Sequence, residues 1–493
     1  MTRLRNAPYK WLVAAAFIFG LFMDLMDLTI VNVALPRLGQ QLKADSSGLE
    51  WVVTGYLLSL AIWIPASGWI GDRFGTKRTF LFALATFTAS SALCGLSQNT
   101  GQLIAFRILQ GVGGGMMTPV GTAMLFRAFP PAERARASLV LTIPTVIAPA
   151  LGPIIGGLLV DDVSWRWIFY VNVPIGVIGF IFSWLFLEEH TEPLSGDFDF
   201  WGFVLSGAGL ALVLYALSKA PEDGWTSATV MSTGLVGIAC FVAMVVVELR
   251  LTRPMLDLRL FVDRMFRNAN IVFFAASASL ISVIFLLPLF LQTLRGYSAI
   301  DTGLILLPQA LAVVLFAQLS GRLYPTVGPR RLLAAALTLF AVSSALFLWI
   351  DLKTNIWWVV GIMFIRGIAM AFTFIPLQAA TYATITPQDT GRASSLFSTN
   401  RQVSASFGVA VLATVLFERA AHYGLKAFDP RFLATPQGQH AGLLGFHDAF
   451  FAGVIISVIG VAFAFLIRDE DAAATMRHGA GQPGEVAIAA AGH

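Results

Sequence analysis

The chain has 493 residues and a formal net charge of +4; 57% of its residues are hydrophobic and only 12% are charged. Globular domains carry about 25% charged residues, and the mean hydropathy of this chain is +0.76. The composition therefore excludes a water-soluble domain and predicts an integral membrane protein. Its two cysteines, Cys94 and Cys240, lie in apolar runs and indicate no disulfide framework.

The sequence contains fourteen runs near the length of about 20 apolar residues that a helix needs to cross a bilayer. Strands of a membrane barrel would have about ten residues of alternating polarity, so these runs predict an all-α protein. The first run is too long for the apolar part of a signal peptide and is expected to remain as a span. In chain order the predicted spans are 11–35, 51–71, 79–97, 102–128, 137–160, 166–187, 200–218, 229–248, 268–293, 301–321, 331–350, 356–382, 393–417 and 449–467.

The distribution of Lys and Arg predicts the orientation, because cytoplasmic loops are enriched in these residues. With the N-terminus inside, the inner loops and termini hold 20 of the 32 basic residues, the outer loops hold nine and three lie within spans. We therefore expect both termini in the cytoplasm, and we attribute the net charge to topology rather than to nucleic-acid binding. The loop 188–199 is an exception, since it is inside by parity yet acidic.

The spans predict four regions: an N-terminal six-helix bundle (1–190), a linker with two extra spans (191–261), a C-terminal six-helix bundle (262–470) and a disordered cytoplasmic tail (471–493). "GWIGDRFGTKRTF" (68–80) follows span 2 and weakly resembles "SGRLYPTVGPRRLL" (320–333), which follows span 10. Two like halves are common in transporters. An outer loop of about thirty residues, 418–448, is expected before the last span, and a periplasmic adaptor that binds there is left open.

Span 1 contains "GLFMDLMDLTIVNVALP" (20–36), with Asp24 and Asp27 three residues apart on one helix face. A charge near the bilayer centre costs roughly 2.5–3.5 kcal/mol, and acids placed there are functional candidates by default. Two close carboxylates in a low dielectric resist ionising together, so we expect one to hold a proton near neutral pH. The pair is thus the candidate proton site, and the alternative is a structural pair buried against Arg107 or against a polar helix interface.

Three arginines lie within spans: Arg107, Arg366 and Arg401. At 1.5 Å per residue, Asp27 lies about 12 Å from the outer end of span 1 and Arg107 about 8 Å from the outer end of span 4, so an ion pair is geometrically plausible. Arg366 and Arg401 lie deep in spans 12 and 13. With Asn32, they are candidates to line a cavity, and helix-to-helix links are the alternative for the two arginines.

Span 5 contains "PTVIAPALGPIIGGLL" (144–159), in which glycines and prolines are dense. Such residues allow close approach of neighbouring helices and bending of the helix. We expect a hinge or a tight gate rather than a plain packing helix; the residues concerned are Pro149, Gly152, Pro153, Gly156 and Gly157.

Other chemistry is not indicated. "GDRFGTKR" lacks the spacing of a phosphate-binding loop, and "GVGGG" (111–115) follows no strand, so neither ATP hydrolysis nor a dinucleotide cofactor is expected. All six histidines lie outside the predicted spans, and no Cys/His cluster suggests a metal. We expect a protein that is not an enzyme, with no cofactor and the proton-motive force as its energy source.

Several motifs resemble those of the fourteen-span drug:proton antiporters of the major facilitator superfamily, over nearly all of residues 10–470. "LMDLTIVNVALP" (25–36) is similar to the first-span motif with Asp27 as its acid, "RILQGVGGG" (107–115) to the fourth-span motif with Arg107, and "APALGPIIGG" (148–157) to the antiporter motif. "WRWIFYVNVP" (165–174) and "NRQVSASFGVA" (400–410) are typical of this branch. "GWIGDRFGTKR" (68–78) resembles the superfamily's loop signature, with Asp72, Arg73, Gly75, Lys77 and Arg78 in place.

The resemblance implies two bundles around a cavity that opens alternately to each side of a cell membrane, and multidrug efflux, hence antibiotic resistance, by exchange with protons. It implies that Asp27 and Arg107 couple protons to substrate, while Asp24 lies outside the motif. It also implies that Asp72 stabilises one gate state at the positive end of the helix that starts near Arg392. Expected partners are lipophilic cations or drugs, protons and membrane lipids. A dedicated exporter of one metabolite, such as a natural product, siderophore or lipid, is the alternative; a receptor or scaffold without transport is a third interpretation.

Overall fold

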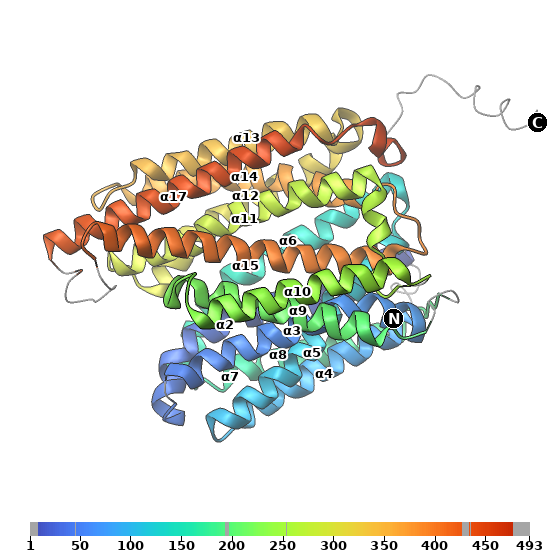
Figure 1. Ribbon diagram of the computed structural model, residues 1–493, viewed down its shortest axis with the longest axis horizontal. Helices are drawn as coiled ribbons and strands as arrows, with labels where there is room; N and C mark the ends of the chain where they lie inside the picture. Colours follow the sequence, from blue (N-terminus) through green and yellow to red (C-terminus); the bar gives the residue numbers. More distant parts are fainter. Residues whose placement is uncertain are drawn as a thin grey trace, which may run out of the picture.

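The computed structural model describes residues 8–44, 46–192, 197–252, 254–425, 433 and 435–476, and within these ranges it contains helices and no strand. Two groups of helices lie side by side with a helical hairpin between them (Figure 1). The predicted all-α membrane protein is thereby confirmed.

The first helix group precedes residue 187 and contains seven α-helices. Helices α7 and α8 are separated by Val171 and together form the predicted sixth span. The bounds are α2 (Tyr9–Leu42), α3 (Ser46–Phe74), α4 (Thr76–Leu96), α5 (Thr100–Ala128), α6 (Arg134–Asp162), α7 (Trp167–Tyr170) and α8 (Asn172–Phe186), with the 3-10 helix η1 (Pro131–Glu133) before α6.

The hairpin consists of α9 (Phe200–Asp223) and α10 (Ala228–Arg250), and α9 packs against both α3 and α15. The second helix group follows η2 (Leu258–Val262). Its bounds are α11 (Arg264–Thr293), α12 (Ala299–Val327), α13 (Pro329–Ala345), η3 (Leu346–Trp349), α14 (Ile356–Thr381), α15 (Thr390–His422), α17 (Pro436–Ala464) and η4 (Glu470–Thr475).

Thirteen helical segments among the described residues are long and apolar enough to span a membrane. The predicted fourth span is α5, which has 29 residues but includes Arg107, two glutamines and a glycine run. Its polar content is matched by its burial, because most of its inner half is enclosed by other helices. The inner half of α5 is thus enclosed by protein and does not need the apolar surface of the other spans.

Two predictions about the C-terminal part are wrong. Residues 418–448 do not form a thirty-residue loop, because α15 continues to His422 and α17 begins at Pro436, where the Thr435 hydroxyl caps it by accepting from the Gly438 N–H at 3.1 Å. Residues 471–475 of the predicted tail belong to η4 (Glu470–Thr475), in which Thr475 bonds Tyr324 at 2.7 Å. Both segments are too polar for a hydropathy search but gain partners in the fold. The rest of the predicted tail, 477–493, lies outside the described residues.

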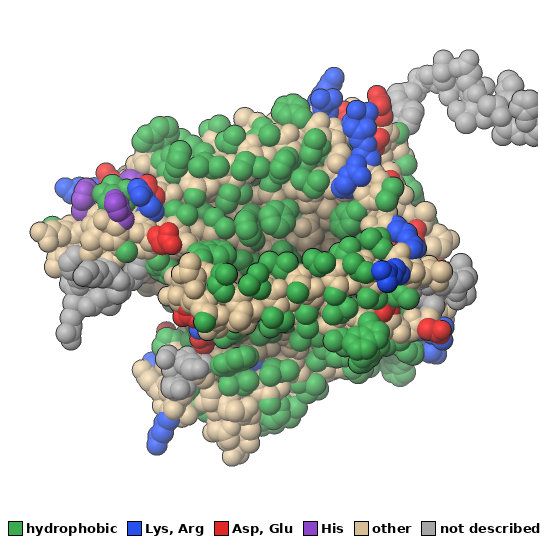
Figure 2. Space-filling view, in the orientation of Figure 1, with side chains coloured by type: hydrophobic (Ala, Val, Ile, Leu, Met, Phe, Trp, Pro, Cys, Tyr) green, Lys and Arg blue, Asp and Glu red, His purple; other side chains and the backbone are tan. Residues whose placement is uncertain are grey.

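The surface follows the pattern of a membrane protein. Apolar side chains cover the middle of the visible face, and charged side chains gather toward its two ends (Figure 2). The start of α2 and helix η4 lie at the same end of the molecule. Lys10 of α2 pairs with Glu133 of η1, and η1 contacts η4. We call this the inner end, after the orientation that the basic residues predict.

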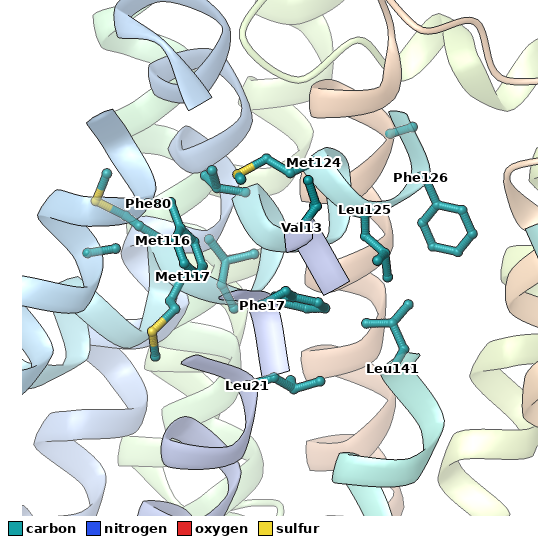
Figure 3. Packing of buried hydrophobic residues seen from close by; sticks show 14 of the residues in the cluster. Val13, Phe17, Leu21, Phe80, Met116, Met117, Met124, Leu125, Phe126 and Leu141 are labelled. Carbon is teal, nitrogen blue, oxygen red and sulfur yellow. The ribbon is translucent and has the colours of Figure 1, made fainter. Parts of the chain in front are cut away.

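The core of the first group depends on close contact between α2, α4, α5 and α6. Phe17 lies between Val13 and Leu21 on α2, with Met117 of α5 on one side and Leu141 of α6 on the other (Figure 3). A Cβ placed on Gly121 would lie 2.1 Å from the Phe17 ring, so the glycine makes room for that ring. Small residues in membrane helices allow such approach without loss of packing.

Gly113 provides a test of this packing. A Cβ at Gly113 would lie 2.6 Å from the Ala83 carbonyl oxygen and 2.7 Å from the Phe87 nitrogen, both on the backbone of α4. We expect Gly113→Ala to force the two helices apart, at a cost of about 1–3 kcal/mol, seen as a lower melting temperature of the purified protein in detergent.

Gly101→Ala is the matched control on the same helix, because only the Asn99 side chain, at 3.5 Å, lies within 4 Å of a Cβ there. Since alanine favours a helix over glycine by about 1 kcal/mol, this variant should melt at the same temperature or higher. Equal melting temperatures for the two variants would contradict the close contact of α4 and α5.

Candidate functional site

Asp27 lies in a fully buried polar cluster inside the first group. Its carboxylate forms an ion pair with Arg107 of α5, the pair that the depths of the two residues made plausible. It also accepts hydrogen bonds from Gln110 Nε2 at 3.1 Å and from Asn172 Nδ2 at 3.3 Å. Three donors from two neighbouring helices thus surround one carboxylate.

Arg107 is held on several sides. Its guanidinium donates to the Gln110 side chain at 2.8 Å and to the Val52 carbonyl at 3.2 Å, and it lies 4.1 Å from the centre of the Tyr56 ring. A cation over an aromatic face is stabilised by the ring quadrupole. The Asp27–Arg107 pair is therefore anchored in α2, α3, α5 and α8, and its contacts also fit the structural alternative.

Asp24 has a different environment, although it lies on the same face of α2. Its two carboxylate oxygens accept from the Tyr56 hydroxyl at 2.7 Å and the Thr118 hydroxyl at 3.0 Å. A Cβ on Gly114 would lie 3.0 Å from Asp24 Oδ1, so the glycine leaves space for the carboxylate. The described residues offer Asp24 no cation within 4 Å, and its direct partners are neutral.

The two arginines of the second group also differ. Arg366 is fully buried and donates to the Ser344 hydroxyl at 2.6 Å and the Ser279 carbonyl at 2.8 Å, with the Phe340 ring centre at 4.0 Å. These contacts join α14 to α11 and α13 and support its alternative as a helix-to-helix link.

Arg401 of α15 is partly exposed, and among the described residues its guanidinium has no hydrogen-bond or ion-pair partner within bonding distance. Asn32 of α2 is exposed as well, and its side chain donates to the Leu28 carbonyl at 3.2 Å. Of the three candidates for a cavity lining, these two have the accessibility that such a position requires.

The proline- and glycine-rich segment lies in α6, which is one continuous helix despite Pro149 and Pro153. Its glycines face neighbouring helices. A Cβ on Gly152 would lie 2.0 Å from Thr29 Oγ1 of α2, and one on Gly157 would lie 3.5 Å from Ile300 of α12. The segment thus brings α6 against both groups, which is the position that a gate helix would need.

The loop signature between α3 and α4 turns at Gly75, whose φ of +103° favours glycine. The Glu189 carboxylate accepts from the Lys77 N–H at 3.0 Å and from the Arg78 N–H at 3.2 Å. The acidic loop 188–192 therefore caps the N-terminus of α4, where negative charge is stabilised. This contact explains why an inner loop is acidic.

Asp72 lies where the two groups meet at the inner end. Its carboxylate pairs with Arg127 at 3.3 Å, and a Cβ on Gly391, in the first turn of α15, would lie 2.5 Å from Asp72 Oδ2. The side chain is thus placed against the N-terminal end of α15. Arg73 and Arg78 of the same signature are exposed, and Lys77 is half-buried with its ammonium bonded to the Leu187 carbonyl at 2.6 Å.

Further hydrogen bonds between the groups surround Asp72. Ser395 Oγ accepts from the Gly68 N–H at 2.8 Å, and Ser394 donates to the Pro119 carbonyl at 2.6 Å. Arg127 and Arg134 donate to the carbonyls of Pro387 and Ile385, each at 3.1 Å. Within the described ranges, the hydrogen bonds and ion pairs that join the first group to the second all lie at or near this end, so the inner end is closed.

An apolar hollow of about 270 Å³ opens between α2 and α6. Phe22, two residues before Asp24, contributes to it, as do Ile18, Leu139, Val140, Ile143, Pro144 and Ile147. Drug-sized ligands bind in mostly apolar clefts with a few polar groups nearby. The hollow therefore offers an apolar surface on the face of α2 that is turned toward α6, whereas Asp24 and Asp27 are turned toward α3, α5 and α8.

Comparison with known proteins agrees with this architecture. The family model of the Major Facilitator Superfamily matches residues 17–409. The chain belongs to this superfamily. It is accordingly a multi-pass membrane transporter of small molecules and not an enzyme.

Relatives of this superfamily member share about a third of its residues. It is 30% identical to an uncharacterised MFS-type transporter, YhcA, of Bacillus subtilis, with 94% of each chain covered. It is 32% identical to a multidrug resistance protein B homolog of Mycobacterium tuberculosis, over 86% of this chain and 79% of that protein. It is also 32% identical to a putative multidrug resistance protein MdtD of Pectobacterium atrosepticum, over 82% of this chain and 86% of that one.

A solved structure, that of the human organic anion transporter MFSD10 (TETRAN), has the same fold with a TM-score of 0.65. It covers 93% of this transporter and all of the other chain at 15% identity. At that identity the likeness concerns the fold alone.

Several residues of the site were not singled out from the sequence. Gln110 and Asn172 lie inside motifs that were recognised, but their contacts with Asp27 could not be read from spacing. Tyr56, Thr118 and Glu189 carry no local signal, since each acts on a residue distant in the chain. A search for polar residues at the depth of the aspartates would have found Tyr56 and Thr118.

The two aspartates should differ in their effect on stability. Asp27→Asn keeps the side-chain shape but leaves Arg107 charged and buried, a change that costs about 3–5 kcal/mol for buried pairs. Asp24→Asn should cost about 1 kcal/mol or less, because one hydroxyl can still donate to the amide oxygen while the other can accept from the amide NH2 group. Melting temperatures in detergent measure the difference.

The double variant Asp27→Asn/Arg107→Gln serves as the control, since it removes the unpaired charge and should recover part of the lost stability. Equal losses for Asp24→Asn and Asp27→Asn would show that the Arg107 pair carries no special share of the stability.

Proposed function

We propose that the protein exports small amphipathic or cationic compounds across a cell membrane in exchange for protons, and thus acts in multidrug efflux. The buried carboxylates of α2 support proton coupling, and the apolar hollow between α2 and α6 supports amphipathic substrates. Two of the relatives described above are named multidrug resistance proteins. The bacterial sources of these relatives favour the cytoplasmic membrane as the location.

The observation that carries the proposal is the pair of neutral hydroxyl partners on Asp24. A hydroxyl can donate to a carboxylate and can also accept from a carboxylic acid. Asp24 can therefore gain or lose a proton and keep both Tyr56 and Thr118 as partners. No buried group is left unpaired in either state, which is the requirement for a site that is loaded and emptied in every cycle.

Asp27 has a complementary part in the proposal. Arg107 is fully buried and has Asp27 as its counter-charge, so we propose that this pair has a structural part and does not exchange the transported proton. Its role is then to position α2 and α5 and to set the field at Asp24, one helical turn away. The proton exchange thereby moves from the motif residue Asp27, which the sequence favoured, to its neighbour Asp24.

The closed inner end supports alternating access. We propose that the first and second helix groups act as the two six-helix bundles, with both termini in the cytoplasm, and that Asp72 and Arg127 stabilise the state with the inner end closed. In the opposite state these bonds would be broken. The close contacts of α6 at Gly152 and Gly157 support a role in sealing the outer side.

A dedicated exporter of one metabolite is the second candidate, because the same carboxylates and hollow would serve a single substrate. A periplasmic adaptor has less room than the sequence suggested, since helices occupy most of the interval 418–448. Breadth of the substrate profile separates the two candidates.

The test uses purified protein in liposomes with an imposed pH gradient and ethidium as the transported dye. We expect the wild-type protein to move ethidium against its gradient. Asp24→Asn should abolish this movement and leave downhill dye exchange, because the site can no longer release a proton. Proton movement, followed with a trapped pH dye, should be lost in parallel.

Ser206→Ala in α9 is a control, as this buried hydroxyl bonds within its own helix and lies outside the site. Uphill transport by Asp24→Asn at the wild-type rate would rule out Asp24 as the proton site. Absence of transport for ethidium and a panel of cationic drugs would favour the dedicated exporter.

A further inference from the structure

Arg401 is a positive charge within a span, and the described part of its own helix group provides no negative charge to balance it. A guanidinium stays protonated in proteins, and a charge within the membrane requires a partner or water. Arg107 has Asp27, and Arg366 has a serine hydroxyl and a backbone carbonyl. The described part of the second group places no carboxylate at Arg401, so its counter-charge must come from elsewhere.

The face of α15 that carries Arg401 is directed to the first group. Ser394 donates to the Pro119 carbonyl of α5, and Arg401 follows Ser394 by seven residues, or two turns, on the same face. Thr118, the neighbour of Pro119, donates to Asp24. Asp24 and Arg401 thus approach the same stretch of α5 from α2 and from α15.

The two residues also lie at similar depth. Pro387 meets Arg127 and Ser394 meets Pro119, so α5 and α15 run in opposite directions. Seven residues span about 10 Å, which puts Arg401 level with the part of α5 near Val112. Asp24 lies beside Gly114, within one turn of that level. The opposite charges of Arg401 and Asp24 act on each other across this gap without an ion pair within 4 Å.

None of the other described groups that face Asp24 can act as its counter-charge. Tyr56 and Thr118 are neutral, and Asp27 is compensated by Arg107. Arg401 is therefore the cation, among the described residues around Asp24, that is not already paired. It is attached to the other helix group, so an attraction between the two side chains acts between the groups.

We propose that Arg401 is a tethered counter-cation of Asp24, which pairs with the ionised carboxylate whenever the carrier holds neither a proton nor a cationic substrate. This proposal rests on the proposed proton-coupled function and deepens it. The pair would join the two helix groups and keep the empty carrier from changing its orientation. A proton or a substrate cation competes with Arg401 for the same carboxylate and releases the groups.

Such a competition gives tight exchange. An exchanger must change its orientation when it carries a proton or a substrate, but not when it is empty. If the empty carrier could reorient, protons would flow without export of substrate. A ligand shifts a conformational equilibrium only through its different affinity for the two states. Here the difference arises because either cation neutralises Asp24 and removes the attraction to Arg401, whose partial exposure leaves its freed charge in contact with water.

The first measurement is distance between the groups, with no substrate present. Spin labels at cysteines replacing Gly101 and Trp357, which are exposed and begin α5 and α14, report the separation at the outer end. In the wild-type background, lowering the pH should broaden or shift the distance distribution as Asp24 takes up a proton. In Arg401→Gln the distance distribution should already contain both orientations at high pH, and it should change little when the pH is lowered. A pH response of Arg401→Gln equal to that of the wild type would overturn the proposal.

The second measurement is proton and dye flux in liposomes. Without dye, Arg401→Gln should pass protons about tenfold faster than the wild type, within the usual 5–150-fold range of coupling between two sites, whereas Arg401→Lys should retain a low leak. Adding Asp24→Asn to Arg401→Gln should remove the leak. A wild-type protein that moves neither ethidium nor the panel of cationic drugs would count against the proposed multidrug function, while the distances would still decide the Asp24–Arg401 pair. An unchanged leak in Arg401→Gln would contradict the proposal.

Discussion

The organisation of the first helix group depends on the buried ion pair of Asp27 and Arg107. Removal of either charge would leave the other buried and unpaired, which costs about 3–5 kcal/mol. The pair needs Gln110, Asn172 and the Val52 carbonyl to complete its hydrogen bonds, and these come from α5, α8 and α3. One electrostatic requirement therefore fixes the rotation of α2 against three helices. That rotation in turn places Asp24 against Tyr56 and Thr118, so the proposed proton site depends on the position of the ion pair.

The second helix group solves the same problem in another way. Arg366 lies on α14, the fourth long helix of its group, as Arg107 lies on the fourth of the first, and each stacks on an aromatic ring. Arg366 is satisfied by a hydroxyl and a carbonyl, with no carboxylate near it among the described residues. The two groups thus differ in the charges within their spans: the acids lie in the first group, and Arg401, which has no partner within bonding distance among the described residues, lies in the second. In the proposed pairing with Asp24, the attraction between the groups would depend on protonation.

The sequence predicted the parts of the structure that depend on composition and missed those that depend on partners. Hydropathy located the long helices, and helix geometry made the pairing of Asp27 with Arg107 plausible, because both follow from local spacing. The polar first turns of α17 and the helix η4 were missed, since their stability comes from the Thr435 cap and the bond of Thr475 to Tyr324. The sequence indicated Glu189 only as one of several acidic residues in a loop where the positive-inside rule predicts basic ones. The hydroxyls around Asp24 could not be found from spacing, because three separate helices bring them together.

The hairpin of α9 and α10 places a constraint on any motion between the groups. Lys219 of α9 pairs with Glu50 of α3 at 2.7 Å, and Trp225, just after α9, donates to Thr414 of α15 at 2.9 Å. Both contacts are toward the end opposite Asp72, so the hairpin links the two groups at the outer end while Asp72 and Ser395 link them at the inner end. If the groups rock about the carboxylates of α2, the exposed Trp225 contact is the easier one to break, and α9 would then move with α3. The additional spans would in this way follow the first group and cover its junction with α15 during the cycle.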